Sequence, residues 1–146
     1  DVSTAKLDHA KTLGAEIVIN AAEADPGTEV RRLIGGSHAA VVTAVSSRAF
    51  EQSVSVLRNG GTVCWIGLPG GKQDDIRMTI SGIVNGEMSV RGSNVGTRQD
   101  LQEAIDFAAR SLARATITTE PLENVNAIFA RMKKGEITGR VVLKLA

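Results

Sequence analysis

Short apolar runs alternate with helix-like segments through the first half of the chain, and this alternation limits the fold more than any other feature. The run at 39–45 is continuously apolar apart from one threonine, as in strands buried on both faces of a parallel sheet. Successive strand–helix–strand passages with short linkers favour parallel strands joined by right-handed crossovers. The sequence therefore predicts an α/β fold.

Periodicity and punctuation set the expected bounds of these elements. Gly14 is expected to end the first helix, Asp25-Pro26 to begin the second, and Ser46 or Ser47 to cap the third. The Asn-Gly-Gly at 59–61 is expected to end that third helix, and a loop follows at 68–71. The helices are expected at 4–13, 26–34, 46–58, 81–86, from 98 onward and at 122–134, and the strands at 16–20, 39–45, 62–67, 76–80, 88–92, 115–119 and 141–145.

Composition excludes several classes of protein. The net charge is +1, which gives little electrostatic support for binding nucleic acid. Cys64 is the one cysteine, so an internal disulfide is excluded and a reducing, cytoplasmic location is expected. No apolar run approaches the roughly 20 residues of a membrane span. These features are typical of a soluble cytoplasmic protein that binds neither nucleic acid nor membrane.

Several stretches, in order and without large gaps, resemble the medium-chain, zinc-dependent alcohol dehydrogenases. The most specific is Gly-Ser-Asn-Val-Gly-Thr-Arg-Gln-Asp at 92–100, and the others lie at 11–15, 59–62, 66–69 and 139–143. The resemblance implies a partial doubly wound (Rossmann-type) parallel sheet that lacks its first strands, with a C-terminal helix and strand. It implies that residues 1–110 are a partial dinucleotide-binding domain and that residues 111–146 return to the catalytic domain.

The resemblance also implies a set of residues that bind NAD. An acidic residue that closes the second strand binds the ribose hydroxyls in such domains; here that residue is Asp1, which disfavours the phosphate of NADP. Lys6 would reach the same ribose, and Arg140 would pair with the pyrophosphate. The remaining implied contacts are Thr43, Ala44 and Val45 for adenosine, Ile66, Gly67 and Leu68 for nicotinamide, and Ser93, Asn94 and Val95 for its carboxamide.

Each of these residues also has a plainer interpretation. Asp1 could be a frayed terminal residue, Lys6 and Arg140 exposed cations, and the residues at 43–45 the end of a strand. The glycines at 67, 92 and 96 could be turn residues alone. Residues alone leave these alternatives open.

Neither a zinc site nor a complete phosphate cradle is expected in this chain. Catalytic zinc needs three protein ligands and an open position, whereas Cys64 lies in an apolar strand and His9 and His38 have no second ligand at useful spacing. The sequence also contains no Gly-x-Gly-x-x-Gly for the pyrophosphate. The resemblance implies a longer parent enzyme that binds zinc and acts on a small alcohol or aldehyde, and this chain alone is expected to be inactive.

Two other functions stay open at this point: a non-catalytic nucleotide-binding or interaction module, and a zinc-free quinone reductase-like relative. The segment at 96–100 favours the alcohol dehydrogenases over the latter. The resemblance implies a homodimer or homotetramer with residues 76–92 at its interface, and an exposed edge strand there would favour pairing.

The sheet is expected to be disturbed at its centre. In the strand order 3-2-1-4-5-6, two strands lie between strand 3 (16–20) and strand 4 (39–45), so these two would stand roughly 14 Å apart. Unpaired apolar edges are costly, so three outcomes are open: 16–20 moves to pair with 39–45, a second chain fills the gap, or the first 35 residues are loosely held. We expect one of the first two.

Overall fold

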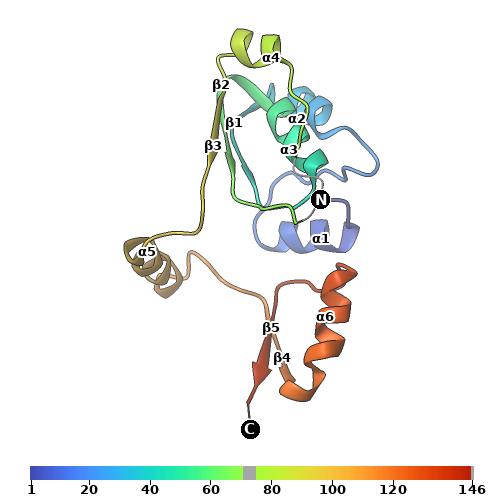
Figure 1. The fold of residues 1–146 in the computed structure, drawn as a ribbon, viewed down its shortest axis with the longest axis vertical. Coiled ribbons are helices and arrows are strands. Elements are labelled where there is room, and N and C mark those ends of the chain that lie inside the picture. Colours follow the sequence, from blue (N-terminus) through green and yellow to red (C-terminus); the bar gives the residue numbers. More distant parts are fainter. Residues whose placement is uncertain (71–74, 146) are drawn as a thin grey trace. The chain divides into compact units, whose positions relative to one another are not determined.

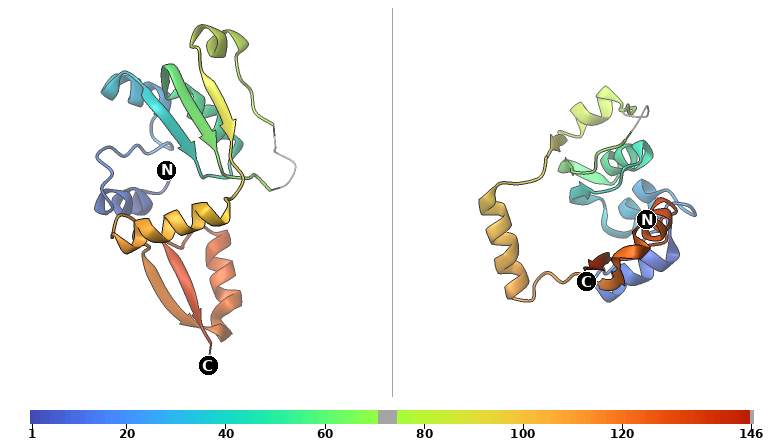
Figure 2. Two further views of the ribbon diagram at one scale, coloured as in Figure 1. Left: turned by 90° about the vertical axis from the view of Figure 1, so that its left-hand side faces the viewer. Right: turned by 60° about the horizontal axis from the view of Figure 1, so that its bottom comes forward.

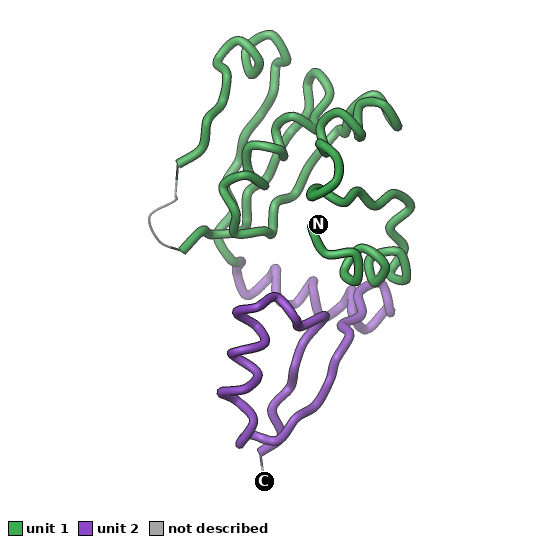
Figure 3. Tube along the Cα trace, turned by 90° about the vertical axis from the view of Figure 1, so that its right-hand side faces the viewer, with its two compact units in different colours: residues 1–95 green, residues 96–146 purple. Residues whose placement is uncertain are grey.

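The computed structural model describes residues 1–70 and 75–145, and the chain divides into two compact units, residues 1–95 and 96–146 (Figures 1 and 3). Gly71, the last residue of the loop expected at 68–71, lies outside the described residues. The boundary at residue 110 concerns the domains of a longer protein and stays a prediction. Within the described residues, no helix combines the length and apolar character needed to cross a membrane.

The first unit is built on a parallel sheet, as predicted. Strands β1 (Ser37–Val42), β2 (Leu57–Trp65) and β3 (Ser89–Gly92) lie in the order β1-β2-β3 (Figure 2). The connection from β1 to β2 contains α3 (Ser47–Ser55), and that from β2 to β3 contains α4 (Ile80–Asn85). The buried core joins the sheet to α3 through Val42, Phe50, Leu57 and Val63.

Two helices precede the sheet at the expected places. Helix α1 spans Thr4–Thr12, and α2 spans Pro26–Ile34 and packs against α3. The Asp25 carboxylate caps α2 by accepting hydrogen bonds from the backbone N–H and the hydroxyl of Thr28, both at 2.8 Å. These two bonds hold the pKa of the Asp25 carboxyl below its usual value. Gly35, with φ of 73°, ends the helix in the left-handed conformation.

The third helix and the strands around it differ from the expected bounds. Strand β1 ends at Val42 rather than at Val45, and α3 ends at Ser55. Strand β2 then runs through the Asn-Gly-Gly at 59–61, because Leu57 pairs with Ser37 and is 1% exposed. The register shift between Ser37 and Ala39 absorbs the extra residues of β2. The glycines thus form an irregularity inside a strand rather than a helix end.

Ser46 occupies the N-cap of α3, but its side chain makes no capping bond within the described chain.

Two expected strands do not form. Residues 16–20 form no strand: the carbonyl of Ile19 and the N–H of Ala21 both bond to the backbone of one residue, Asp1, rather than to a strand. Residues 76–79 are also irregular: the N–H of Arg77 bonds to the Glu51 side chain at 2.9 Å rather than to a neighbouring strand, and Ile76 packs on the core. Helix α4 begins at Ile80, one residue before the helix expected at 81–86.

The expected pairing of residues 16–20 with the strand at 39–45 is wrong for this structure, whereas the filling of the gap by a second chain stays a prediction. Residues 16–20 do not pair with β1, whose partner among the described residues is β2 alone. A groove of about 610 Å³ lies between the two, lined by Ile17, Val18 and Ile19 on one side and Ala39 and Val41 on the other. Helices α1 and α2 also line this groove, and α2 packs against α3 and β1.

The second unit contains α5 (Arg98–Ala109), the parallel pair β4 (Ile117–Pro121) and β5 (Arg140–Lys144), a short 3-10 turn η1 (Leu122–Asn124) and α6 (Val125–Lys133). Thr97 and Asp100 form a capping box that begins α5. The expected C-terminal helix and strand are both confirmed. Ile128 is the buried hydrophobic residue of this unit among those described.

Candidate functional site

Backbone hydrogen bonds join the three parallel strands where their carboxyl ends meet, and this side of the sheet is called the carboxyl edge below. The backbone N–H groups of Ile66 and Gly67 both donate to the carbonyl of Val42, at 2.9 and 2.8 Å. Beyond β3, the N–H of Ser93 donates to the carbonyl of Trp65 at 2.9 Å. Open parallel sheets bind ligands outside this edge.

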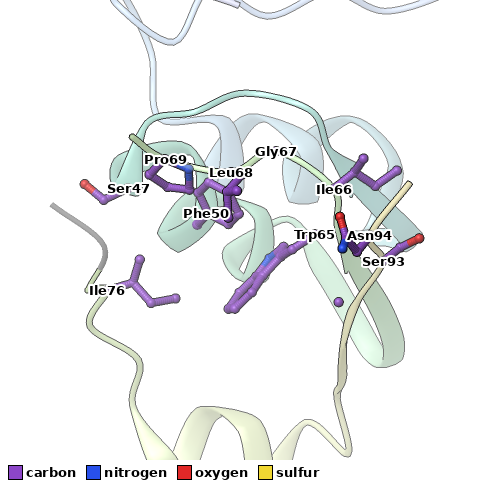
Figure 4. A pocket seen from close by; sticks show the side chains of 11 residues that line it. Ser47, Phe50, Trp65, Ile66, Gly67, Leu68, Pro69, Ile76, Ser93 and Asn94 are labelled. Atoms are coloured by element: carbon purple, nitrogen blue, oxygen red, sulfur yellow. The ribbon is translucent and has the colours of Figure 1, made fainter. Parts of the chain in front are cut away.

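A largely apolar pocket of about 550 Å³ opens at this edge (Figure 4). Trp65 lies between Phe50, Leu68 and Pro69 on one side and Ile66, Ser93 and Asn94 on the other. Hydrophobic walls with a few polar groups are typical of cofactor pockets. The lining residues are Ser47, Phe50, Trp65, Ile66, Gly67, Leu68, Pro69, Ile76, Gly92, Ser93 and Asn94.

Trp65 is fixed in the wall of this pocket from two sides. Its ring stands at 80° to that of Phe50 with the centroids 5.4 Å apart, which is a favourable edge contact. Its indole Nε1 donates to Oγ of the buried Ser53, 3.1 Å away. Because both contacts come from α3, the helix sets the shape of the pocket.

Glycine is suited to two positions at this edge, 67 and 92, for different structural reasons. A Cβ at Gly67 would lie against the carbonyl oxygen of Ala44 and within 2.9 Å of the carbonyl carbon, so the close approach of these two loops requires glycine. A Cβ at Gly92 would meet nothing within 4 Å, and Gly92 lines the pocket. Glycine at 92 therefore leaves space in the pocket rather than solving a packing problem.

The structure brings five of the predicted nicotinamide and carboxamide contacts together. Ile66, Gly67, Leu68, Ser93 and Asn94 all line the same pocket. Val95 directly follows Asn94 in the sequence but does not line the pocket, and the Val95 side chain is 90% exposed. Its φ of 45° is unusual for a β-branched residue. Backbone strain of this kind clusters at functional sites.

The predicted adenosine and ribose contacts lie along the groove beside β1. Asp1 and Lys6 line the 610 Å³ groove, and Asp1, Thr43 and Ala44 line an adjoining one of about 570 Å³. The Asp1 carboxylate accepts the N–H of Ser3 at 2.8 Å. Val45 is exposed beyond the end of β1, and Arg140 begins β5 in the second unit.

Sequence reasoning missed six lining residues: Ser47, Phe50, Trp65, Pro69, Ile76 and Gly92. Phe50 lies in the core, and Ile76, which was expected in a strand, packs against that core. The available signal was Trp65, the one tryptophan, which stands at the end of a strand just before the Ile-Gly-Leu at 66–68. A large aromatic residue at the carboxyl edge of a parallel sheet is well placed to line a ligand pocket.

Among the described residues, the charged groups with shifted pKa values are not part of the lining of this pocket. Asp100 is held below its usual pKa by the hydroxyl and backbone N–H of Thr97, and Glu120 by hydrogen bonds from Arg131 and Asn124. Within residues 1–70 and 75–145, no group of three or more His, Cys, Asp or Glu side chains could hold a metal ion. The residues described here thus do not fit a zinc centre, and the pocket is suited to an organic group.

Comparison with known proteins identifies the family. Residues 1–110 match the model of the zinc-binding dehydrogenases, and the chain therefore belongs to that family. It is 49% identical to an alcohol dehydrogenase of Moraxella sp. (strain TAE123) over 98% of this chain and 41% of that protein. It is 46% identical to one of Geobacillus stearothermophilus, over 99% of this chain and 42% of that protein.

A solved structure has the same arrangement of elements. The alcohol dehydrogenase of the archaeon Aeropyrum pernix superposes with a TM-score of 0.88 at 29% identity, over 99% of this chain and 41% of that one. The Rossmann-type fold expected from sequence is thereby confirmed. The chain spans about two fifths of the length of the relatives it matches.

Proposed function

We propose that this chain forms the nicotinamide side of the cofactor site in an NAD-dependent alcohol dehydrogenase. The observation that carries the proposal is the pocket at the carboxyl ends of β2 and β3, in which Ile66, Gly67, Leu68, Ser93 and Asn94 meet. The family and the names of the relatives support the same activity. The substrate class would be a small alcohol or aldehyde.

The residues of the pocket suit a nicotinamide ring. When bound, NAD supplies the acceptor for the hydride that leaves the alcohol carbon. Phe50, Trp65 and Leu68 would exclude water from one side of the ring, and the backbone at Ser93 and Asn94 would bind the carboxamide. Asp1 would bind the ribose hydroxyls, because it lies in the groove beside Thr43 and Ala44.

Zinc has no place in this part of the proposal. The described residues offer no ligand set for it, and Cys64 lies in β2 paired with Val41 and Arg91. We propose that the metal of the whole enzyme is bound by residues outside this chain. The 146-residue chain alone should then form no NADH from ethanol or longer alcohols, with or without added zinc.

The association of the chain is a separate part of the proposal. Strand β3 is one of the two edge strands of the described sheet, and Met78 and Ile80 expose apolar side chains before it. Such an edge favours a two-fold interface, so we propose a cytoplasmic homodimer or homotetramer. Light scattering that gives a monomer at high concentration would overturn this part.

Nuclear magnetic resonance can test the nicotinamide site at the weak affinity expected of half a cofactor site. Nicotinamide mononucleotide should shift the indole N–H signal of Trp65 and the amide signals of Ser93 and Asn94, whereas adenosine monophosphate should leave all three unchanged. Trp65 is the one tryptophan, so its indole signal is assigned directly.

Two glycine variants sharpen the test. Gly92→Val fills the space that the pocket leaves open and should weaken binding of nicotinamide mononucleotide at least fivefold. Gly70→Val is the matched control, since a Cβ there also meets nothing within 4 Å and Gly70 is not among the pocket-lining residues. Equal binding by both variants, or no shift with either nucleotide, would overturn the proposed site.

A further inference from the structure

The dipeptide Asn-Gly occurs twice in the sequence, at 59–60 and 85–86, and one hydrogen bond links the two occurrences. The N–H of Gly60, near the start of β2, donates to the carbonyl of Gly86 at 2.8 Å. Gly86 directly follows α4, which lies at the amino ends of β2 and β3 (Figure 1). The position of this carbonyl therefore depends on α4, although it protects a group in β2.

Asn-Gly is the asparagine sequence most prone to deamidation, because glycine leaves its backbone nitrogen unhindered. The glycine nitrogen attacks Cγ of the asparagine, the new N–Cγ bond replaces the bond from Cγ to Nδ2, and ammonia leaves with the proton of the N–H. Water then opens the succinimide ring at either carbonyl and gives aspartate or isoaspartate. Isoaspartate lengthens the backbone by one carbon atom. The first step needs a glycine N–H that is free of its hydrogen bond.

The hydrogen bond that protects Gly86 is the easier of the two to open. The N–H of Gly86 donates to the carbonyl of Gly82 at 3.1 Å, in the last turn of α4. That helix has six residues, all within the described chain, and none of them is buried. Isolated helices this short are marginal, and helix ends fray. Glu87, the next residue, has φ of 49°, a left-handed conformation that is costly for a residue other than glycine.

The hydrogen bond of Gly60 is held between two fixed points of β2. On one side Leu57 is 1% exposed, and on the other Thr62 pairs with both β1 and β3. A Cβ at Gly60 would meet nothing within 4 Å among the described residues, so the space around it is open. The carbonyl of Gly86 is thus the group that protects the Gly60 nitrogen.

Conversion of Asn85 to isoaspartate would remove this protection. A Cβ at Gly86 would lie 2.7 Å from the carbonyl oxygen of Gly82 and 2.8 Å from Cε of Met88. The extra backbone carbon at position 85 therefore has no room while the turn keeps its shape. Because the turn must change, the carbonyl of Gly86 moves and the N–H of Gly60 loses its acceptor.

We propose that Asn59 and Asn85 are coupled deamidation sites, in which Asn85 converts first and its conversion exposes Asn59. Both side chains line one pocket of about 560 Å³ that Arg31 and Arg77 also line, so the products would place two carboxylates in a pocket that contains two arginines. This pocket shares no described residue with the proposed nicotinamide pocket. The inference rests on backbone contacts within one chain and does not depend on the proposed binding of NAD.

Ageing of the full 146-residue chain in mildly alkaline buffer tests the inference. Top-down mass spectrometry reports both sites on the same molecule, and electron-transfer fragmentation separates isoaspartate from aspartate. Asn85 should convert from the start, whereas Asn59 should convert after a lag and mainly on chains that already carry isoaspartate at 85. The same chain in urea gives the rate of each site without structure, and each folded rate is compared with that reference.

A matched pair of variants tests the direction of the coupling. Asn85→Gln keeps an amide at 85 that does not readily form the five-membered ring, and it should slow conversion of Asn59 at least fivefold. Asn59→Gln makes the same change at the other site and should leave the rate at Asn85 within twofold. Asn85→Asp adds the charge without the extra backbone carbon, and it should initially slow conversion of Asn59 as Asn85→Gln does.

Three results would overturn the inference. The first is conversion of Asn59 before Asn85. The second is an equal rate at Asn59 in the unsubstituted chain and in Asn85→Gln, which would show that the two sites react independently. The third is a folded chain that converts at neither site while the chain in urea converts at both.

Discussion

The indole Nε1 of Trp65 donates a hydrogen bond to Oγ of Ser53 at 3.1 Å, and the same Oγ lies 2.6 Å from the carbonyl of Phe50, to which its hydroxyl donates. This short chain of bonds links the wall of the pocket to the interior of α3. Ser53 is buried, so its hydroxyl satisfies two partners that solvent reaches poorly.

Ser53→Ala should therefore destabilise the first unit. The indole N–H loses its acceptor in a partly buried place, which costs about 1–3 kcal/mol. Urea unfolding followed by Trp65 fluorescence measures the loss. Ser55→Ala is the control, because the Ser55 hydroxyl makes only a local bond to Gln52 at 2.8 Å, and it should cost less. Equal losses would mean that the Trp65–Ser53 bond contributes nothing to stability.

Gly67→Ala should also destabilise the first unit, because the added methyl group meets the carbonyl of Ala44. Separating the two loops should lower the free energy of unfolding by about 1–3 kcal/mol. Gly70→Ala enters open space and should change it by less than about 0.5 kcal/mol. Urea titrations of the two variants decide, and a silent Gly67→Ala would show that the loops after β1 and β2 move apart readily.

Val95→Asn should stabilise the chain, in contrast to most surface substitutions. Asparagine tolerates the left-handed conformation that Val95 adopts with φ of 45°, so the change relieves strain on the order of 1 kcal/mol. Val90→Asn, in β3 opposite Val63, should destabilise because it weakens a strand. Thermal unfolding compares the two variants. A destabilising Val95→Asn would mean that contacts of the valine side chain outweigh the strain.

The alternation of the sequence predicted the parallel sheet, α1, α2 and the final strand, because those elements follow from local periodicity and caps such as Asp25. The prediction from sequence failed where a segment needs a tertiary partner to become a strand. Residues 16–20 and 76–79 have strand-like composition, yet neither pairs with a neighbouring strand in the part of the chain that the structure describes.

The same distinction applies to the pocket. Ile66, Gly67 and Leu68 were predicted through the resemblance, whereas Phe50 and Ile76 reach the pocket by packing on β2 from other elements. Gly67 was expected to admit a ligand, but packing against Ala44 already accounts for it. No local pattern distinguishes these two reasons for a glycine.

The ion pair between Glu120 of β4 and Arg131 of α6 should make the second unit sensitive to acid. Arg131 Nη1 lies 2.7 Å from Glu120 Oε1, and this hydrogen bond, with a second from Asn124, lowers the pKa of Glu120 from its ordinary value of 4.5. A carboxyl whose pKa is lower in the folded state stabilises that state above the unfolded pKa. The contribution is lost as the pH falls through the folded pKa.

Arg131→Gln should therefore raise the pKa of Glu120 toward 4.5 and destabilise the unit at neutral pH but not in acid. Carbon-detected titration of the Glu120 carboxyl and unfolding at neutral and acidic pH measure both effects.

Lys133→Gln removes the same charge from the last turn of α6 without breaking the Glu120–Arg131 hydrogen bond, and it should leave the titration of Glu120 nearly unchanged. Equal shifts in the two variants would assign the effect to the net charge of α6 rather than to the bond.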